Sequence, residues 1–304
     1  IPNMYKIAGE LLPCVFHVSA RCVASHALNI FGDHSDVYAC RQTGFAMLAE
    51  TNPQEVMDLG AVAHLASIEG RVPFINFFDG FRTSHEYQKI EVMDQEDIRP
   101  LVPMDKVKEF RSRALTPEHP EARGMAENPE TFFAHREVCN RYYDEVPGIV
   151  EKYMEAVSKI TGREYKLFSY YGAEDAERVI ICMGSVTEAA REAIDYLNGK
   201  GEKVGMVSVH LYRPFSVKHL LAAVPKTCKR IAVLDRTKEP GANGEPLYLD
   251  VKDAFYNEEN RPVIVGGRYG LGSCDTTPTM ICSVYENLAL PMPKDHFTVG
   301  IVDD

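Results

Sequence analysis

The sequence predicts an α/β protein built on parallel sheets, in two parts. Over residues 1–81, short apolar runs alternate with helix-like segments. Residues 54–69 are apolar on nearly every side, as in a helix buried between layers, and an aromatic, β-branched strand follows at 72–78. From residue 179 onward the same alternation returns. Strands that alternate with helices in this way favour a parallel sheet.

Length and composition limit the possible classes. At 304 residues the chain suits two domains of about 150 residues each. The net charge of -11, with no clustered basic face visible in the sequence, argues against a nucleic-acid partner. No apolar run approaches the ~20 residues that span a bilayer, and the amino end has no signal pattern, so we expect no membrane partner and a cytoplasmic protein.

The cysteines are expected to be reduced and structural. The sequence contains eight of them and no CxxC pair, whereas cluster-binding motifs use much tighter spacing. Several lie inside apolar runs, where a free thiol behaves as a small hydrophobe. The positions are Cys14, Cys22, Cys40, Cys139, Cys182, Cys228, Cys274 and Cys282.

The first half places two basic groups after predicted strands. An apolar strand at 14–18 ends at Ser19-Ala20-Arg21 and leads into a helix-like segment. A short strand predicted at 37–40 is followed by Arg41-Gln42-Thr43-Gly44, which is predicted to open another helix. Open α/β sheets bind ligands at the carboxyl ends of their strands. Both arginines are therefore candidate ligand-binding residues.

Residues 81–143 are rich in charge and proline and are predicted to form a long connection. Within it, Thr83-Ser84-His85-Glu86 fits a capping box at a helix start, and a role in a site is an equally open alternative. An amphipathic helix is predicted at 144–162, where Gly162 is a natural stop. We place the domain boundary after this helix, which divides the chain into residues 1–165 and 166–304.

The second half predicts a small doubly wound domain of four strands. The strands are expected at 179–183, 204–209, 230–234 and 263–265, and the helices at 187–197, 217–223 and 247–255. The last helix is expected to begin with Thr277 as its cap and Pro278 in its first turn. Residues 297–302 also read as a strand, and both ends of the chain are expected to be cut from a longer protein.

Arg21 is the stronger candidate for chemistry. A guanidinium group at the mouth of a buried sheet can hold a carboxylate through two charge-assisted hydrogen bonds. A structural ion pair with one of the acidic residues is the open alternative for Arg21 and the favoured one for Arg41. No metal site is expected, since His17, His26, Asp33, His34 and Asp36 do not reproduce a closed ligand spacing. The glycines at 267–272 are expected to mark a close backbone approach rather than a phosphate loop.

Several long stretches resemble the pyruvate:ferredoxin (flavodoxin) oxidoreductase family. They include FHVSARCVASHALNIFGDHSDVYACRQTGFAMLAE, VPFINFFDGFRTSHEYQKIE and VLDRTKEPGANGEPLYLDV, and the resemblance covers essentially the whole chain. It implies that residues 1–165 are an N-terminally truncated thiamine-enzyme pyrimidine-type domain. Residues 166–304 would then be a transketolase C-terminal-like doubly wound domain, also truncated.

The resemblance implies an enzyme of anaerobic metabolism and electron transport. The full-length protein would convert pyruvate and coenzyme A to acetyl-CoA and carbon dioxide, passing electrons to ferredoxin or flavodoxin. Thiamine diphosphate, Mg²⁺ and [4Fe-4S] clusters are the implied cofactors. A homodimer is implied, located in the cytoplasm or in a mitochondrion-derived organelle such as a hydrogenosome.

The same resemblance assigns a role to Arg21 and leaves the chain without a catalytic residue. The family's substrate arginine falls at Ser19-Ala20-Arg21, so Arg21 is implied to hold the pyruvate carboxylate, with Arg41 a weaker candidate. The glutamate that activates thiamine would precede Ile1, and the diphosphate, magnesium and cluster sites would lie in later parts. These 304 residues alone are therefore expected to be catalytically silent.

Two other functions stay open at this point. A non-catalytic scaffold or interaction protein could retain the same pair of domains without the remaining active-site parts. A pyruvate:NADP oxidoreductase relative would share these residues and differ far downstream.

Overall fold

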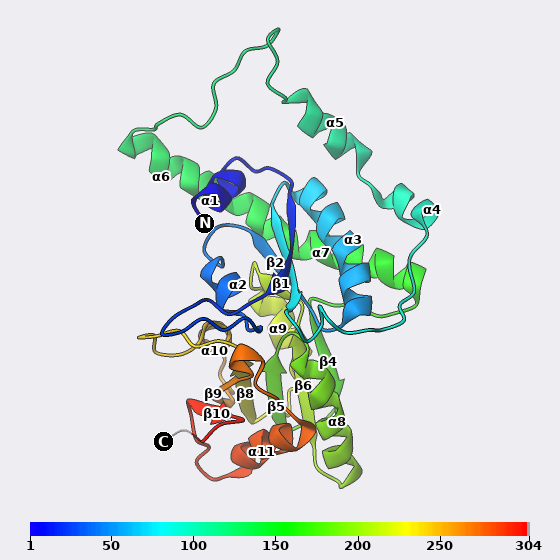
Figure 1. Cartoon of the computed structure of the whole chain (residues 1–304), viewed down its shortest axis with the longest axis vertical. Helices are drawn as coiled ribbons and strands as arrows, with labels where there is room; N and C mark the ends of the chain where they lie inside the picture. Colours follow the sequence, from blue (N-terminus) through cyan, green and yellow to red (C-terminus); the bar gives the residue numbers. More distant parts are fainter. Residues whose placement is uncertain (303–304) are drawn as a thin grey trace.

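The computed structural model describes residues 1–302, which fold around two largely parallel sheets (Figure 1). The first sheet has the order β1-β3-β2-β7, and the first three strands by sequence run parallel to one another. The last, β7, comes from the second half of the chain and pairs antiparallel with β2. The bounds are β1 (Val15–Ala20), β2 (Ala46–Glu50), β3 (Phe74–Asp79) and β7 (Leu211–Arg213).

The second sheet is the larger one. In the described residues it has six strands in the order β10-β9-β8-β5-β6-β4, all parallel except β4, which is antiparallel to β6. The sequence pattern predicted a doubly wound domain of four strands and a further strand at 297–302, where β10 lies, but it did not predict the edge strand β4. The bounds are β4 (Phe168–Gly172), β5 (Arg178–Cys182), β6 (Val204–Val209), β8 (Arg230–Asp235), β9 (Val263–Tyr269) and β10 (Phe297–Val299).

The long helix α3 packs on the first sheet, and the long helix α7 packs against α3 (Figure 1). In α3 (Pro53–Gly70), the Asn52 side chain accepts a hydrogen bond from the Glu55 amide at 3.0 Å, which caps the helix start. The helix is buried on several sides, as predicted. In α7 (Asn140–Thr161), only one face is buried, and the helix ends at Gly162 with a left-handed backbone. That glycine is the stop that the sequence indicated.

The helices of the second sheet divide between its two faces. On one face, α8 (Val186–Gly199) packs against α11 (Pro278–Ala289) through residues such as Ile194 and Ile281. On the other, α9 (Val217–Ala223) and α10 (Pro246–Ala254) contribute to the core shared with the first sheet. Thr277 caps α11, as predicted, by accepting from the Met280 amide at 3.4 Å.

The segment 81–143 forms an arm that extends away from the sheets (Figure 1). Its short helices bury none of their residues, in agreement with a charged, proline-interrupted connection. They are α4 (Gln95–Ile98), η1 (Arg99–Leu101), α5 (Met104–Ser112) and α6 (Pro129–Val138), and outside the arm lie α1 (Pro2–Gly9), α2 (Ser35–Ala39) and η2 (Leu271–Ser273).

Four local predictions in the first half were wrong. Residues 37–40 are not a strand: α2 covers most of them, since a short apolar run suits a buried helix turn equally well. Residues 46–50 form β2 rather than a helix, and the chain between Arg21 and α2 is irregular. The Thr83–Glu86 motif caps no helix, because residues 80–85 form a turn, in which the Ser84 hydroxyl accepts from the Phe81 amide at 2.9 Å, and irregular chain follows it. The alternative, a role in a site, stays a prediction, and Glu86 lines a cavity between the two parts of the chain.

The glycines near the end of β9 act as the sequence indicated. A Cβ atom on Gly267 would lie 2.4 Å from the Phe297 ring, so only glycine lets β10 approach β9 this closely. Within the described residues, no helix is long and apolar enough to cross a membrane.

Candidate functional site

The carboxyl ends of β1 and β3 lie side by side and bring Arg21 next to Gly80. In the parallel register of these strands, Ala20 is opposite Asp79. The Gly80 amide donates to the Ala20 carbonyl at 3.1 Å, and a Cβ atom on Gly80 would lie 2.6 Å from Arg21 Nε. Glycine at position 80 therefore leaves the space that the Arg21 side chain occupies.

The guanidinium group of Arg21 is held in place by neighbouring residues, but not all of its hydrogen-bond donors have a partner. Its Nη1 donates to the Ile30 carbonyl at 3.0 Å, and its Cζ lies 4.3 Å from the centroid of the Phe81 ring. Its Nε is buried and has no hydrogen-bond partner among the described residues. The main chain is fixed as well, because the Arg21 amide donates to Asp36 Oδ2 at 2.9 Å. No carboxylate of a described residue forms an ion pair with Arg21, so the group can still receive an anion.

Arg41 lies in a different environment, at the end of α2. Its Nη2 reaches both carboxylate oxygens of Glu239, at 2.9 and 3.2 Å, and its Nη1 donates to the Tyr38 carbonyl at 2.9 Å. This ion pair joins the first part of the chain to the second. It is the structural role that the sequence analysis favoured for Arg41 over substrate contact.

The sequence analysis missed the most strongly connected group near the site, the carboxylate of Asp79 at the end of β3. Asp79 is buried and has partners from both halves of the chain. Its Oδ1 lies 2.5 Å from His34 Nε2, and its Oδ2 lies 2.7 Å from Arg236 Nη1. The Ser185 amide and hydroxyl donate to the same Oδ2 at 2.9 and 2.5 Å. We refer to these four residues as the Asp79 junction.

The charges of the junction explain how a buried carboxylate is tolerated there. Burial alone would raise the pKa of Asp79, but His34, Arg236 and Ser185 outweigh it and hold this pKa well below the usual range. The available sequence signal was an acidic residue that directly follows a buried aromatic strand. The partners of Asp79 lie 45, 106 and more than 150 positions away, so spacing could not reveal them.

A second buried contact lies beside this junction. The Tyr38 hydroxyl donates to Asp235 Oδ1 at 2.7 Å, and the amides of Leu247 and Tyr248 donate to the same carboxylate at 3.0 Å each. Burial raises the pKa of Asp235 to about 6 despite these hydrogen bonds. The start of α10 is thereby linked to α2 of the first part.

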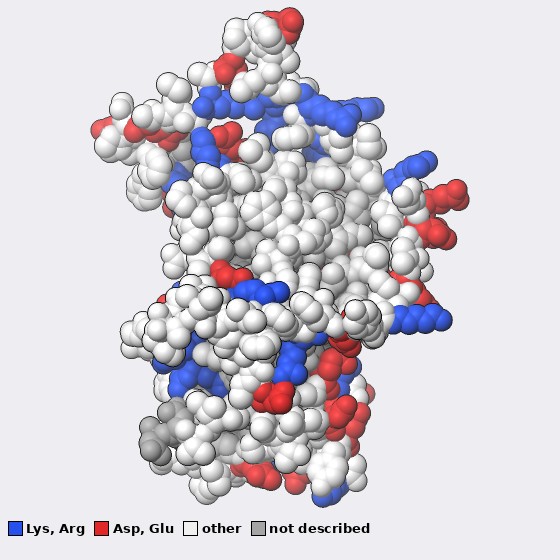
Figure 2. All heavy atoms as spheres, in the orientation of Figure 1, with Lys and Arg blue, Asp and Glu red and all other residues white. Residues whose placement is uncertain are grey.

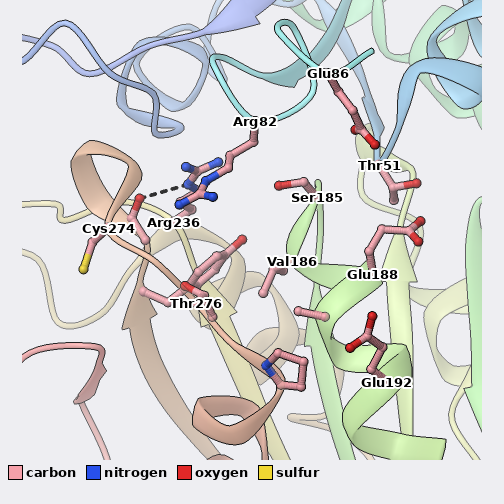
Figure 3. Close-up of a pocket in the computed structure, with 14 residues that line it drawn as sticks. Thr51, Arg82, Glu86, Ser185, Val186, Glu188, Glu192, Arg236, Cys274 and Thr276 are labelled. Carbon is pink, nitrogen blue, oxygen red and sulfur yellow. Dashed lines mark hydrogen bonds between the residues drawn. The ribbon is translucent and has the colours of Figure 1, made fainter. Parts of the chain in front are cut away.

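A cavity of about 310 Å³ opens next to the Asp79 junction, between the two sheets (Figure 3). Ser185 and Arg236 of the junction contribute to its lining, as does Thr51 after β2. In the view of Figure 3, Arg82 lies close to Arg236 on one side, while Glu188 and Glu192 of α8 lie across from them. Domain interfaces and the carboxyl ends of parallel strands are common places for small-molecule sites.

Glu50, at the end of β2, is buried without a hydrogen bond to either carboxylate oxygen among the described residues. Burial, reinforced by the nearby Glu55 carboxylate, raises the pKa of Glu50 well above its usual range. The protonated form is therefore favoured. Glu55 itself lies 3.4 Å from His210 Nε2, and the His210 charge helps to lower its pKa.

The possible metal ligands within residues 1–302 are dispersed. No group of three or more His, Cys, Asp or Glu side chains in this range is placed to hold a metal ion. All eight cysteines lie in this range and are free thiols. Burial raises the pKa of Cys182 to about 12, which is the opposite of what thiolate ligands need.

Comparisons with known proteins identify relatives for the whole chain. Residues 1–155 match the family described as pyruvate flavodoxin/ferredoxin oxidoreductase, thiamine diP-binding, and residues 176–281 match pyruvate:ferredoxin oxidoreductase core domain II. The pyruvate-flavodoxin oxidoreductase of Enterobacter agglomerans is 63% identical over 303 residues. The pyruvate:ferredoxin oxidoreductase of Moorella thermoacetica is 60% identical over 304 residues. Each alignment covers 100% of this chain and 26% of the relative.

A solved structure supports the fold. The 2-oxoglutarate:ferredoxin oxidoreductase from Magnetococcus marinus superposes with a TM-score of 0.59 at 17% identity, covering 95% of this chain and 52% of that one. Together with the family matches, this confirms the predicted α/β class with parallel sheets and a thiamine-enzyme domain.

Replacing Asp79 with Asn should strongly destabilise the intact protein at pH 6–8. The substitution leaves Arg236 buried without its counter-charge, a change that costs about 3–5 kcal/mol in comparable buried pairs. Folding lowers the pKa of Asp79, so the ionised carboxylate stabilises the folded protein at pH values above its pKa in the unfolded chain, about 3.9. This stabilisation is lost as the pH falls below that value and the carboxylate becomes protonated. Thermal and urea denaturation measure the effect.

The matched control for this prediction is Asp275→Asn. Asp275 also pairs with an arginine, Arg82, but its side chain is 78% exposed, so its loss should cost less than about 1 kcal/mol. Equal effects of the two substitutions would contradict a stabilising Asp79 junction.

Glu50→Gln should stabilise the intact protein more at pH 8 than at pH 5. Folding raises the pKa of Glu50, so the wild-type protein loses stability as the pH rises above the unfolded value of about 4.3. Glutamine stays neutral and avoids this loss. The melting temperatures of Glu50→Gln and the wild type are compared at the two pH values, with the exposed Glu174→Gln as control. If the difference between Glu50→Gln and the wild type does not change with pH, Glu50 is not a buried, protonated carboxyl group.

Proposed function

Because the chain belongs to the pyruvate:ferredoxin/flavodoxin oxidoreductase family, we propose that the protein containing it oxidatively decarboxylates pyruvate. Coenzyme A would accept the acetyl group, and ferredoxin or flavodoxin would accept the electrons. The observation that carries the proposal is 63% identity over the full length of the chain to a pyruvate-flavodoxin oxidoreductase. The chain spans about a quarter of the length of the curated relatives it matches first, so the activity belongs to the larger protein.

Within this reaction we assign Arg21 to the substrate carboxylate. Its partly unused guanidinium, its position at the carboxyl end of β1 and its orientation over Phe81 support this role. A fixed planar fork can hold a carboxylate in one orientation, which is the positioning that a decarboxylation needs. Arg41 is a weaker candidate because Glu239 already occupies its side chain.

The cofactors would be supplied largely from outside these residues. Residues 1–302 hold no group of side chains suited to a metal ion, and their cysteines are dispersed, so they do not fit a magnesium-diphosphate site or an iron-sulfur cluster. We therefore derive no step through these groups. Thiamine diphosphate, Mg²⁺ and [4Fe-4S] clusters in the larger protein remain part of the proposal, supported by the family match.

The division at residue 165, a homodimeric state and a cytoplasmic or organellar location are further parts of the proposal. The division is supported by the sheets, which draw their strands mainly from either side of this position, although β7 crosses over. Light scattering tests the homodimeric state, and cell fractionation tests the cytoplasmic or organellar location. A non-catalytic scaffold would bind neither thiamine diphosphate nor clusters, and an NADP-linked relative would reduce NADP with pyruvate.

Arg21→Ala in the intact protein should lower kcat/KM for pyruvate by about 100-fold or more, since two charge-assisted hydrogen bonds of about 1.5–3 kcal/mol each are lost. Arg21→Lys retains the charge without the fork and should recover only part of the activity. Steady-state assays with ferredoxin or flavodoxin measure this.

The control for the Arg21 variants is the iron-sulfur absorbance of the same preparations, which should not change. Arg41→Gln should mainly lower the melting temperature, because it breaks the ion pair with Glu239. Wild-type turnover in Arg21→Ala would remove the assignment of this residue while leaving the proposed reaction intact.

A further inference from the structure

Four arginines gather where the arm meets the first sheet: Arg71, Arg111, Arg113 and Arg123, here called the arginine cluster. Arg71 ends α3 with a left-handed backbone, Arg111 and Arg113 lie at the end of α5, and Arg123 lies in the loop that follows. Figure 2 shows Lys and Arg side chains concentrated at this end of the molecule, near α5 and that loop. This local excess of positive charge occurs in a chain of net charge -11.

The carboxylates that lie beside the cluster do not balance its positive charge. Glu109 Oε1 lies 3.6 Å from Arg71 Nη1, and Glu121 Oε2 lies 2.9 Å from Arg123 Nη2. Glu109 also pairs with Lys106, at 3.4 Å, and the Glu121 side chain is 62% exposed. Two carboxylates thus face four guanidinium groups, and one of the two is shared with a lysine.

The arginines also repel one another. Burial, and then the neighbouring charges of Arg71 and Arg123, lower the pKa of Arg113. Among the described residues, the buried Nε atoms of Arg71 and Arg113 have no hydrogen-bond partner. Like charges held together with unsatisfied donors cost free energy, and a bound anion would offset both contributions.

Aromatic rings hold two of these guanidinium groups in place. Arg71 Cζ lies 5.2 Å from the Tyr142 ring centroid, and Arg113 Cζ lies 5.7 Å from that of Phe110. Arg123 Nη2 also donates to the Arg113 carbonyl, which ties the loop to the end of α5. Three of the four arginines are therefore held by neighbouring groups, whereas Arg111 is exposed at the end of α5.

A cavity of about 240 Å³ lies within the cluster. It is lined by Arg111, Arg113 and Arg123 together with the apolar side chains of Leu12, Phe110 and Leu115. Its volume is far above what one water molecule requires. The cavity is partly open to solvent, and the guanidinium groups of Arg111 and Arg113 suit a tetrahedral, multiply charged anion there, since a guanidinium fork can hold two of its oxygens. Arg123 already donates from Nε and Nη2 to Glu121, so its contribution would come from Nη1 and from its positive charge.

We propose that the arginine cluster is a binding site for a phosphate-bearing small molecule that carries at least two negative charges. The site is built from α3, α5 and the loop after α5, and it does not include Arg21 or the Asp79 junction. It goes beyond the proposed function and does not depend on it. The sequence analysis saw no basic face because Arg71 is 40 residues from the nearest other member of the cluster.

Isothermal titration calorimetry of the intact protein with inorganic pyrophosphate tests the proposal. Pyrophosphate should bind, and raising the salt concentration should weaken binding because salt screens exposed charges. Arg113→Gln and Arg123→Gln should each weaken it by about 10-fold or more, since each removes at least one charge-assisted contact. Arg113→Lys should lie between wild type and Arg113→Gln, because it keeps the charge without the fork.

The matched control is Arg99→Gln, an exposed arginine of the arm outside the cavity, which should leave binding unchanged. Melting temperatures establish that each variant is folded before titration. The proposal is overturned if pyrophosphate does not bind, or if it binds a folded Arg113→Gln as tightly as wild type. Citrate binding as tight as that of pyrophosphate would overturn the phosphate class, because carboxylates alone would then suffice.

Discussion

The buried ion pair between Asp79 and Arg236 connects the two sheets, and the placement of the candidate site depends on this connection. Asp79 ends a strand of the first sheet, whereas Arg236 follows β8 of the second. Ser185, at the start of α8, donates two hydrogen bonds to the same carboxylate. Removing these charges from water is costly, and only the full set of partners offsets that cost. These polar contacts of defined geometry act together with the shared apolar core and the β2–β7 pairing to hold the two sheets in one relative position.

The position of the candidate site follows from this junction. Asp79 is directly followed by Gly80 and Phe81, which make room for the Arg21 side chain and lie against its guanidinium group. A displacement of the end of β3 would therefore move the surroundings of Arg21 as well. Arg41, through its pair with Glu239, and Tyr38, through its hydrogen bond to Asp235, add further contacts between the same parts. Residues that do not touch a substrate can thus determine how Arg21 presents its unused donors.

The sequence predicted those features that depend on local patterns. Helix α3, helix α7 with its Gly162 stop and strand β6 follow from side-chain periodicity and turn residues, and Thr277 follows from capping preferences. Short apolar runs were ambiguous: residues 37–40 turned out helical, and residues 46–50 extended. The two-residue spacing of Arg111 and Arg113 gave no hint of Arg71 and Arg123 beside them. Contacts between distant residues, such as those of Asp79, have no local signature, and the resemblance to a known family drew attention to Arg21 instead.

A double-mutant cycle on Asp79 and Arg236 tests the central claim most directly. The stabilities of the wild type, Asp79→Asn, Arg236→Gln and the double variant of the intact protein are compared by denaturant unfolding at pH 7. A stabilising buried pair predicts that the double variant is less destabilised than the sum of the single variants, with a coupling free energy of about 1–3 kcal/mol. Strictly additive effects would contradict the account, because they would mean that the two charges do not act on each other and that the sheets are held together in another way.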